Sequence, residues 1–203
     1  MLYIFDEVHG LDDDFYAYAV PHLSEERINK INKLKSPLHK SLSAVAYLLL
    51  RYALVAKYGL DEKVLFGYGK NEKPYLRDYP NIHFNLSHTA NAVACAVSGL
   101  PIGVDVQRVS EVSDSVAKRI LSAREYGVYL SANKSGDYFS RIWAIKESVL
   151  KQTGQGISGD FRSLSADELS EITVYKGDGY YCCVTRADAI AKKVGFEELR
   201  YWR

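Results

Sequence analysis

Apolar side chains recur at helical spacing in two long stretches of the chain. In the first stretch, residues 38–57, one side carries Leu42, Val45, Leu49, Tyr52 and Ala56. In the second, residues 137–152, one side carries Phe139, Ile142, Trp143, Lys146, Val149 and Leu150. This period predicts two amphipathic helices, each long enough to organise a core. Gly59 directly follows the first stretch, as glycine often does at a helix end.

Two shorter helices are also predicted. Ser24 is followed by two acidic residues, which is typical of a capped helix start, and Pro37 ends that segment. The other short helix is expected over residues 112–121.

Short runs rich in apolar and β-branched residues predict strands between and around the helices. They cover residues 2–5, 15–20, 83–87, 92–97 and 102–106. Residues 171–176 and 179–185 flank Gly177-Asp178-Gly179 and predict a β-hairpin. The order of helices and strands is loosely similar in the two halves of the chain, although no sequence repeat or low-complexity linker is visible. The pattern therefore predicts an α+β fold.

The composition is that of an ordinary globular protein. The chain has 203 residues, 26 basic and 25 acidic side chains, and a net charge of +1. This balance gives no reason to expect bulk attraction to nucleic acid or to an anionic membrane. The longest apolar run, residues 44–50, is too short to cross a bilayer. The amino terminus lacks the features of a signal peptide, and three cysteines cannot supply a disulfide framework, so we expect a cytoplasmic protein.

Three short segments carry candidate chemistry. They are Phe84-Asn85-Leu86-Ser87-His88-Thr89, Gly103-Val104-Asp105-Val106-Gln107 and Trp143-Ala144-Ile145-Lys146-Glu147-Ser148-Val149-Leu150-Lys151. Glu147 and Lys151 are four residues apart and share a helix face, which is also the pattern of a common surface salt bridge. Asp105 interrupts an apolar strand, where an unpaired carboxylate would be costly to bury unless the strand is an exposed edge. Asp105 and Glu147 together would suit Mg²⁺, with a lysine beside it to bind pyrophosphate.

Ser87 and His88 supply a hydroxyl and an imidazole at a strand end. His88 could equally be an ordinary loop histidine. The two neighbours cannot easily form the hydrogen bond of a catalytic serine–histidine pair, and the chain contains no Gly-x-Ser-x-Gly elbow. Phosphate binding suits this pair better than acyl chemistry.

In this order and spacing, the three segments resemble the signature of the Sfp-type 4′-phosphopantetheinyl transferase family. The likeness extends over most of the chain, from about Leu23 to Val184. The resemblance implies two similar α+β halves in a pseudo-two-fold arrangement, each a small sheet packed on a long helix, with a boundary between residues 101 and 102. It also implies a monomer that binds coenzyme A between the halves. The enzyme would move phosphopantetheine to a serine of an apo acyl, peptidyl or aryl carrier protein and release 3′,5′-adenosine bisphosphate.

The resemblance also implies roles for individual residues. Asp105 and Glu147 would hold Mg²⁺ against the pyrophosphate, and Lys151 would bind that pyrophosphate, with Lys146 beside it. Glu125 would lie near the metal and is a candidate to activate the incoming serine. The residues expected to contact coenzyme A phosphates are Arg27, Lys30, Lys73, Ser87 and His88.

Two positions depart from the family pattern. Gln107 replaces the usual glutamate, so we expect a two-carboxylate site in which the Gln107 carbonyl is a weak Mg²⁺ ligand. Leu42 stands where many relatives carry a polar residue near the nucleotide, and His39 or Lys40 is expected to compensate.

Two further segments, and the function itself, allow other interpretations. Residues 154–159 match G-x-G-x-x-G, but they follow a predicted helix rather than a strand, which favours a structural turn. The basic residues between Lys30 and Lys40 could be a solvated helix face. The main alternative function is a non-catalytic coenzyme A or carrier-protein binding module with a degenerate metal site, which only Gln107 favours.

Overall fold

The computed structural model describes residues 1–154, 161–169, 171–186 and 189–200, and it contains both α-helices and β-sheets. The helices are α1 (Asp13–Ala19), α2 (Glu25–Asn32), α3 (Pro37–Tyr58), α4 (Asp114–Ile120), α5 (Ala123–Ser131), α6 (Gly136–Thr153) and α7 (Phe196–Leu199). The strands are β1 (Leu2–Phe5), β2 (Phe66–Tyr68), β3 (Pro74–Leu76), β4 (His83–His88), β5 (Val93–Ser98), β6 (Val104–Arg108), β7 (Thr173–Gly177), β8 (Tyr180–Val184) and β9 (Ala191–Lys193).

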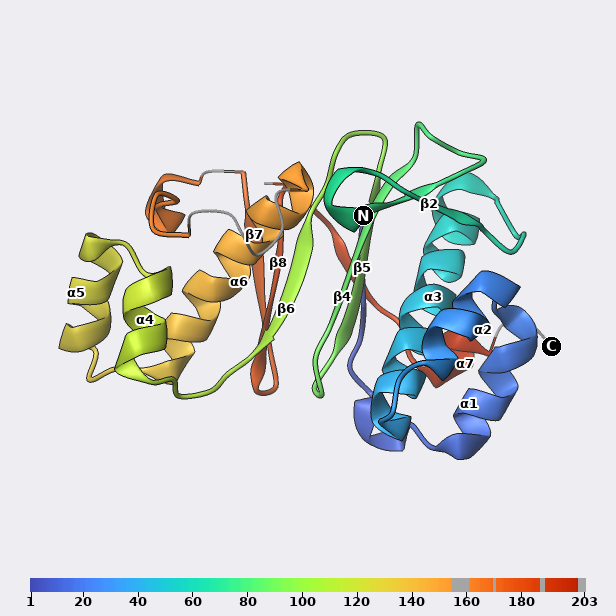
Figure 1. The fold of residues 1–203 in the computed structure, drawn as a ribbon, viewed down its shortest axis with the longest axis horizontal. Coiled ribbons are helices and arrows are strands. Elements are labelled where there is room, and N and C mark those ends of the chain that lie inside the picture. Colours follow the sequence, from blue (N-terminus) through green and yellow to red (C-terminus); the bar gives the residue numbers. More distant parts are fainter. Residues whose placement is uncertain (155–160, 170, 187–188, 201–203) are drawn as a thin grey trace.

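The elements form two lobes, each with a long helix packed on a small sheet (Figure 1). In the first lobe, α3 packs on a four-stranded sheet of order β4-β5-β1-β9. In the second, α6 packs on a three-stranded sheet of order β6-β8-β7. The predicted α+β class and the long helix on a small sheet in each half are therefore confirmed.

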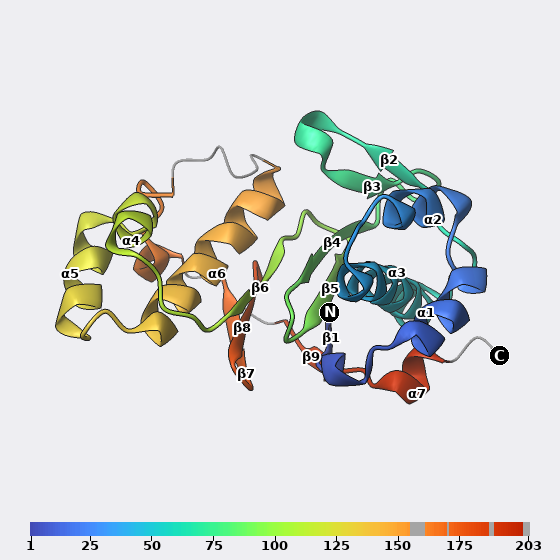
Figure 2. The ribbon, with the colours of Figure 1, turned by 60° about the horizontal axis from the view of Figure 1, so that its bottom comes forward.

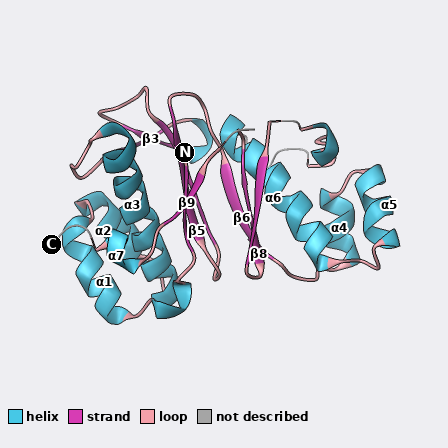
Figure 3. Cartoon of the chain, turned by 180° about the vertical axis from the view of Figure 1, so that it is seen from behind, coloured by secondary structure: helices cyan, strands magenta, loops and turns pink. Residues whose placement is uncertain are grey.

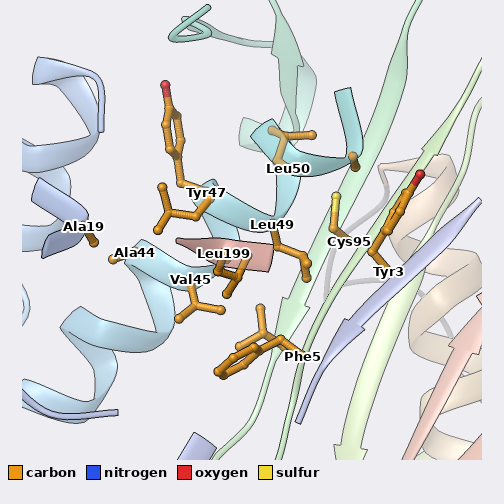
Figure 4. Close-up of a cluster of buried hydrophobic side chains, with 14 of the residues drawn as sticks. Tyr3, Phe5, Ala19, Ala44, Val45, Tyr47, Leu49, Leu50, Cys95 and Leu199 are labelled. Carbon is orange, nitrogen blue, oxygen red and sulfur yellow. The ribbon is translucent and has the colours of Figure 1, made fainter. Parts of the chain in front are cut away.

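The two sheets lie between the two long helices (Figures 1 and 3). Alternate residues of β1 and β5 explain this layering. Tyr3 and Phe5 of β1 belong to the core cluster under α3 (Figure 4), whereas Leu2 and Ile4 join a cluster shared with β6 and β8. In β5 the residues that face β6 and β8 are alanines, and their small side chains allow the sheets to approach closely. One period-2 pattern thus builds two apolar layers.

The end of the chain returns to the first lobe (Figure 2). Strand β9 pairs in parallel with β1, and α7 packs against α3. The expected boundary between residues 101 and 102 falls in the connection from β5 to β6, but β9 and α7 add to the half that precedes it.

Several local predictions are confirmed and one is wrong. The Ser24 side chain accepts a hydrogen bond from the Arg27 amide at the start of α2, and Gly59 ends α3 with a left-handed φ of 70°. Residues 15–20 were expected to form a strand, but most of them belong to α1. Asp12 explains this correction, because its carboxylate caps that helix at the Phe15 amide. None of the helices described is long and apolar enough to span a membrane.

Candidate active site

Gly103 brings strand β6 into close contact with helix α6. A Cβ atom at this position would lie 1.9 Å from the carbonyl oxygen of Ser148 and 2.6 Å from the amide nitrogen of Gln152. Only glycine allows this approach. Asp105 lies two residues further along the strand and therefore on the same face, toward the helix that carries Glu147 and Lys151.

Asp105 is a buried carboxylate with one satisfied and one unsatisfied oxygen. Its Oδ1 accepts a hydrogen bond from Ser87 Oγ at 2.9 Å and lies 2.5 Å from Lys151 Nζ. Its Oδ2 is buried and finds no hydrogen-bond partner among the described residues. Burial raises the pKa of Asp105, and the Lys151 ammonium opposes that rise. An unpartnered carboxylate oxygen in such surroundings favours the approach of a cation.

Glu147 adds a second carboxylate close to that of Asp105. It is buried, and burial followed by the negative charge of Asp105 raises its pKa. Gln107 follows Asp105 by two residues on the same strand, and its Nε2 donates a hydrogen bond to the Arg108 carbonyl at 3.4 Å. In the part of the chain that the structure describes, no group of three or more His, Cys, Asp or Glu side chains is placed to hold a metal. Two carboxylates, one of which has an unpartnered oxygen, and a nearby amide fit Mg²⁺, which commonly takes one or two protein carboxylates and fills its shell with water and phosphate.

A cavity of about 350 Å³ in the first lobe gathers positive side chains. Its lining includes Arg27, Lys30, His39 and His88, together with the rings of Phe66 and Tyr68. We call it the cationic cavity. The pKa of His88 is lowered by partial burial and then by the charges of Arg27, His39 and Lys151. Ser87, the neighbour of His88 in the chain, accepts a hydrogen bond from Lys151 at 2.9 Å, so the cationic cavity lies near the lysine that pairs with Asp105.

Arg27 is held firmly at the wall of this cavity. Its Nη2 donates to the carbonyl oxygen and to Oγ of Ser43, both at 2.8 Å, while its buried Nε has no partner among the described residues. Lys30 lies with its ammonium 5.3 Å from the centre of the Tyr68 ring. Fixed positive charge beside aromatic rings suits a nucleotide that carries phosphate groups.

Lys73 lies in a second cavity of about 480 Å³, lined by residues from both lobes, such as His83 and Gln152. The Lys73 ammonium donates to the Gln152 carbonyl at 2.7 Å, and Asn71 Nδ2 donates to the Gly154 carbonyl at 2.7 Å. Burial lowers the pKa of Lys73. A loop of the first lobe thus caps the C-terminal end of α6, an interaction that the sequence did not predict.

Lys146 and Glu125 lie in a sealed ion pair. Lys146 Nζ is 2.5 Å from Glu125 Oε2, and the two side chains are 0% and 1% exposed. Lys146 also donates to the carbonyls of Ile120 and Phe161, and Glu125 Oε1 accepts from the Ala166 amide. The structure therefore does not bring these two residues to the partly open pair of Asp105 and Lys151.

The structure also locates the departures from the family pattern. Leu42 is buried in the core under α3, while His39 lines the cationic cavity. Lys40 is not among the residues that line this cavity. Of the glycine-rich stretch, Gly154 ends α6 with a φ of 72°, whereas residues 155–159 lie outside the described part of the chain.

Comparison with known proteins identifies similar sequences across most of the chain. Residues 101–193 match the family model of the 4′-phosphopantetheinyl transferase superfamily. A 4′-phosphopantetheinyl transferase of Bacillus subtilis is 32% identical over 171 residues, which cover 81% of this chain and 75% of the relative. The transferase Sfp of the same species is 34% identical over 148 residues, or 70% of this chain and 65% of that protein.

Another match comes from a Nostoc species. Its transferase HetI is 34% identical over 145 residues, which cover 67% of this chain and 61% of the relative. Among solved structures, the holo-[acyl-carrier-protein] synthase of Thermotoga maritima matches 42% of this chain and 61% of its own, with 20% identity and a TM-score of 0.35.

Proposed function

This chain belongs to the 4′-phosphopantetheinyl transferase superfamily, and we propose that Asp105, Glu147, Lys151 and the cationic cavity carry out its reaction. The enzyme transfers 4′-phosphopantetheine to a carrier protein. The observation that carries the residue assignment is the half-satisfied Asp105 carboxylate, which lies beside Glu147 and near the cationic cavity.

The cationic cavity binds the nucleotide end of coenzyme A. Arg27, Lys30 and His88 face the phosphate groups, and Phe66 and Tyr68 offer apolar surface for the adenosine. Lys73 lines the second cavity rather than this one, but its neighbour Pro74 lines both, so we propose that Lys73 lies at the border of the nucleotide site. Positive charge held in place before the substrate arrives is worth more than flexible charge, because little reorganisation is needed.

Asp105 and Glu147 would hold Mg²⁺, with the Gln107 carbonyl as a weak oxygen ligand. When bound, the metal neutralises charge on the pyrophosphate. Because Lys151 already lies 2.5 Å from Asp105 Oδ1, its ammonium is positioned to contact pyrophosphate oxygens at the same place.

The transfer itself needs positioning and charge neutralisation more than a reactive enzyme side chain. The carrier serine oxygen attacks the β-phosphorus of coenzyme A and forms a new O–P bond. The bond from that phosphorus to the bridging oxygen breaks, and 3′,5′-adenosine bisphosphate leaves as its negative charge is balanced by Lys151. The serine proton is released to solvent.

For Lys146 and Glu125 we propose a structural role. Both are closed off from solvent and their polar atoms are bonded within the second lobe. We further propose a monomer, because both lobes of one chain supply the site. A reducing, cytoplasmic location fits its three buried, unpaired cysteines.

The test is to incubate the protein with coenzyme A, Mg²⁺ and a panel of apo acyl, peptidyl and aryl carrier proteins, and to weigh the carriers by mass spectrometry. The expected result is the gain of one phosphopantetheine on at least one carrier, lost when the carrier serine is replaced. Asp105→Ala and Glu147→Ala should each remove most of this activity while the circular dichroism spectrum stays unchanged.

A binding module with a degenerate metal site is the second candidate, and Gln107 is the observation that favours it. Coenzyme A binding without modification of any carrier, even at high Mg²⁺, would support this candidate and contradict the proposed residue assignment.

A further inference from the structure

Strands β4 and β6 are neighbouring edges of two different sheets, and side chains join them. Asn85 Oδ1 accepts a hydrogen bond from the Val104 amide at 2.8 Å, and Ser87 Oγ accepts one from the Val106 amide at 3.1 Å. No backbone ladder pairs these two strands in the described chain. Two side chains at alternate positions of β4 therefore take the place that main-chain carbonyls would occupy in a continuous sheet.

Ser87 makes two further contacts that Asn85 does not make. Its hydroxyl lies 2.9 Å from Asp105 Oδ1 and 2.9 Å from Lys151 Nζ. An ammonium and an amide can only donate, and an ionised carboxylate can only accept. The single hydroxyl proton of Ser87 is therefore directed to Asp105, and its two lone pairs face Val106 and Lys151.

These contacts use the whole hydrogen-bonding capacity of the Ser87 hydroxyl. The side chain is also buried, at 7% exposure. To donate to a phosphate, Ser87 would have to release Asp105 and leave both oxygens of that carboxylate without a hydroxyl donor. This cost separates Ser87 from its neighbour His88, which lines the cationic cavity.

We propose that Ser87 is a positioning residue for Asp105 rather than a phosphate contact. By holding Oδ1 at the junction of the two lobes, its hydroxyl fixes the carboxylate so that Oδ2 stays available to a divalent cation. The junction between the sheets and the geometry of the metal site thus share one atom, Ser87 Oγ. This inference rests on the proposed function, since it assumes that Asp105 binds the metal.

The test separates metal affinity from coenzyme A affinity in Ser87→Ala. Mn²⁺ binding at saturating coenzyme A is followed by electron paramagnetic resonance, and coenzyme A binding in EDTA is followed by calorimetry. We expect roughly tenfold weaker Mn²⁺ binding, because groups that orient a metal ligand are commonly worth about 10–100-fold in affinity. Coenzyme A affinity in EDTA should change by less than about twofold.

Three control variants give this test its contrast. Asn85→Ala removes the same kind of bond to a β6 amide without touching Asp105, so it should lower stability about as much as Ser87→Ala and leave Mn²⁺ affinity within about twofold. His88→Ala should weaken coenzyme A binding in EDTA and spare Mn²⁺. Ser87→Thr keeps the hydroxyl and should retain most Mn²⁺ affinity. If Ser87→Ala does not fold, Ser87→Cys takes its place, since it keeps the size of the side chain with a weaker hydrogen bond.

The opposite pattern would overturn the inference. If Ser87→Ala weakens coenzyme A binding in EDTA and leaves Mn²⁺ affinity unchanged, Ser87 is a phosphate contact. If the unmodified protein binds coenzyme A but no Mn²⁺, the proposed metal site fails, and the positioning role fails with it.

Discussion

Helix α6 carries two lysines, five residues apart, that form ion pairs of the same length in very different surroundings. Lys146 pairs with Glu125 at 2.5 Å, with both side chains at most 1% exposed. Lys151 pairs with Asp105 at 2.5 Å, but the lysine is 29% exposed and lies at an open edge between the lobes. Pair geometry alone therefore does not separate a structural ion pair from a functional one.

The difference lies in how completely each carboxylate is bonded. The Glu125 oxygens accept hydrogen bonds from the amides of Ser122 and Ala166 in addition to Lys146. Asp105 has a satisfied Oδ1 and an unpartnered, buried Oδ2. A completed network rigidifies a core, whereas a missing partner at an open edge indicates a place for a ligand.

The largest expected effect is the loss of stability when the sealed pair of Lys146 and Glu125 is broken. Lys146→Met leaves Glu125 buried without its counter-ion, so the free energy of unfolding should fall by about 3–5 kcal/mol. Urea unfolding measures this loss, and the double variant Lys146→Met with Glu125→Leu should recover a large part of it. A loss below about 1 kcal/mol would contradict the structural role of the pair.

The partly exposed pair of Asp105 and Lys151, which we call the open pair, should affect activity more than stability. Lys151→Met should lower kcat/KM by about 100-fold, because it removes positive charge at the pyrophosphate. Its unfolding free energy should fall by less than half of the Lys146→Met loss, since Lys151 is partly exposed and Asp105 keeps its bond from Ser87. Near-normal activity with a large loss of stability would mean that both lysines are structural.

A smaller effect, on the Mg²⁺ requirement, is expected from a substitution of Gln107 in strand β6. Gln107→Glu adds a carboxylate on the face of the open pair, so the Mg²⁺ concentration for half-maximal rate should fall about three- to tenfold. Gln107→Ala is the matched control and should not lower that concentration. An unchanged Mg²⁺ requirement in Gln107→Glu would count against any contact between residue 107 and the metal shell.

The smallest effect is expected where the first lobe caps α6, just beyond Lys151. Lys73→Met removes the donor to the Gln152 carbonyl, and Asn71→Ala removes the donor to the Gly154 carbonyl. Each should lower the unfolding free energy by about 1 kcal/mol, as measured by urea unfolding. If the Lys73 ammonium contacts coenzyme A, Lys73→Met alone should in addition weaken coenzyme A binding. Equal weakening by both variants would assign that effect to the cap rather than to the lysine charge.

Much of the secondary structure could be predicted from local patterns, because its causes are local. Helical periodicity predicts α3 and α6, and the Gly177-Asp178-Gly179 turn predicts the β7–β8 hairpin. Helix α5 was missed, although Ser122 and Glu125 form a capping box that signals its start. Strand β9 could not be predicted in this way, since its pairing with β1 depends on residues far apart in the chain.

The sequence could predict which residues form the candidate site, but not the contacts between them. The sequence grouped Asp105, Glu147 and Lys151, and the structure brings them together. The position of Lys146 was visible in the periodicity, because it shares a helix side with Phe139 and Leu150, which are buried. The carbonyl partners of Lys146 and the contacts of Ser87 with Asp105 and Lys151 are tertiary contacts, which no local pattern records.

We propose that the pair of Asp105 and Lys151, and not the pair of Glu125 and Lys146, marks the metal site. A direct test is an Mn²⁺ titration by electron paramagnetic resonance at saturating coenzyme A, with the unmodified protein, Asp105→Ala and Glu125→Gln. We predict one bound ion per chain in the unmodified protein, loss of that ion in Asp105→Ala, and its retention in folded Glu125→Gln. Undiminished binding in Asp105→Ala, or loss of the ion in folded Glu125→Gln, would contradict this account.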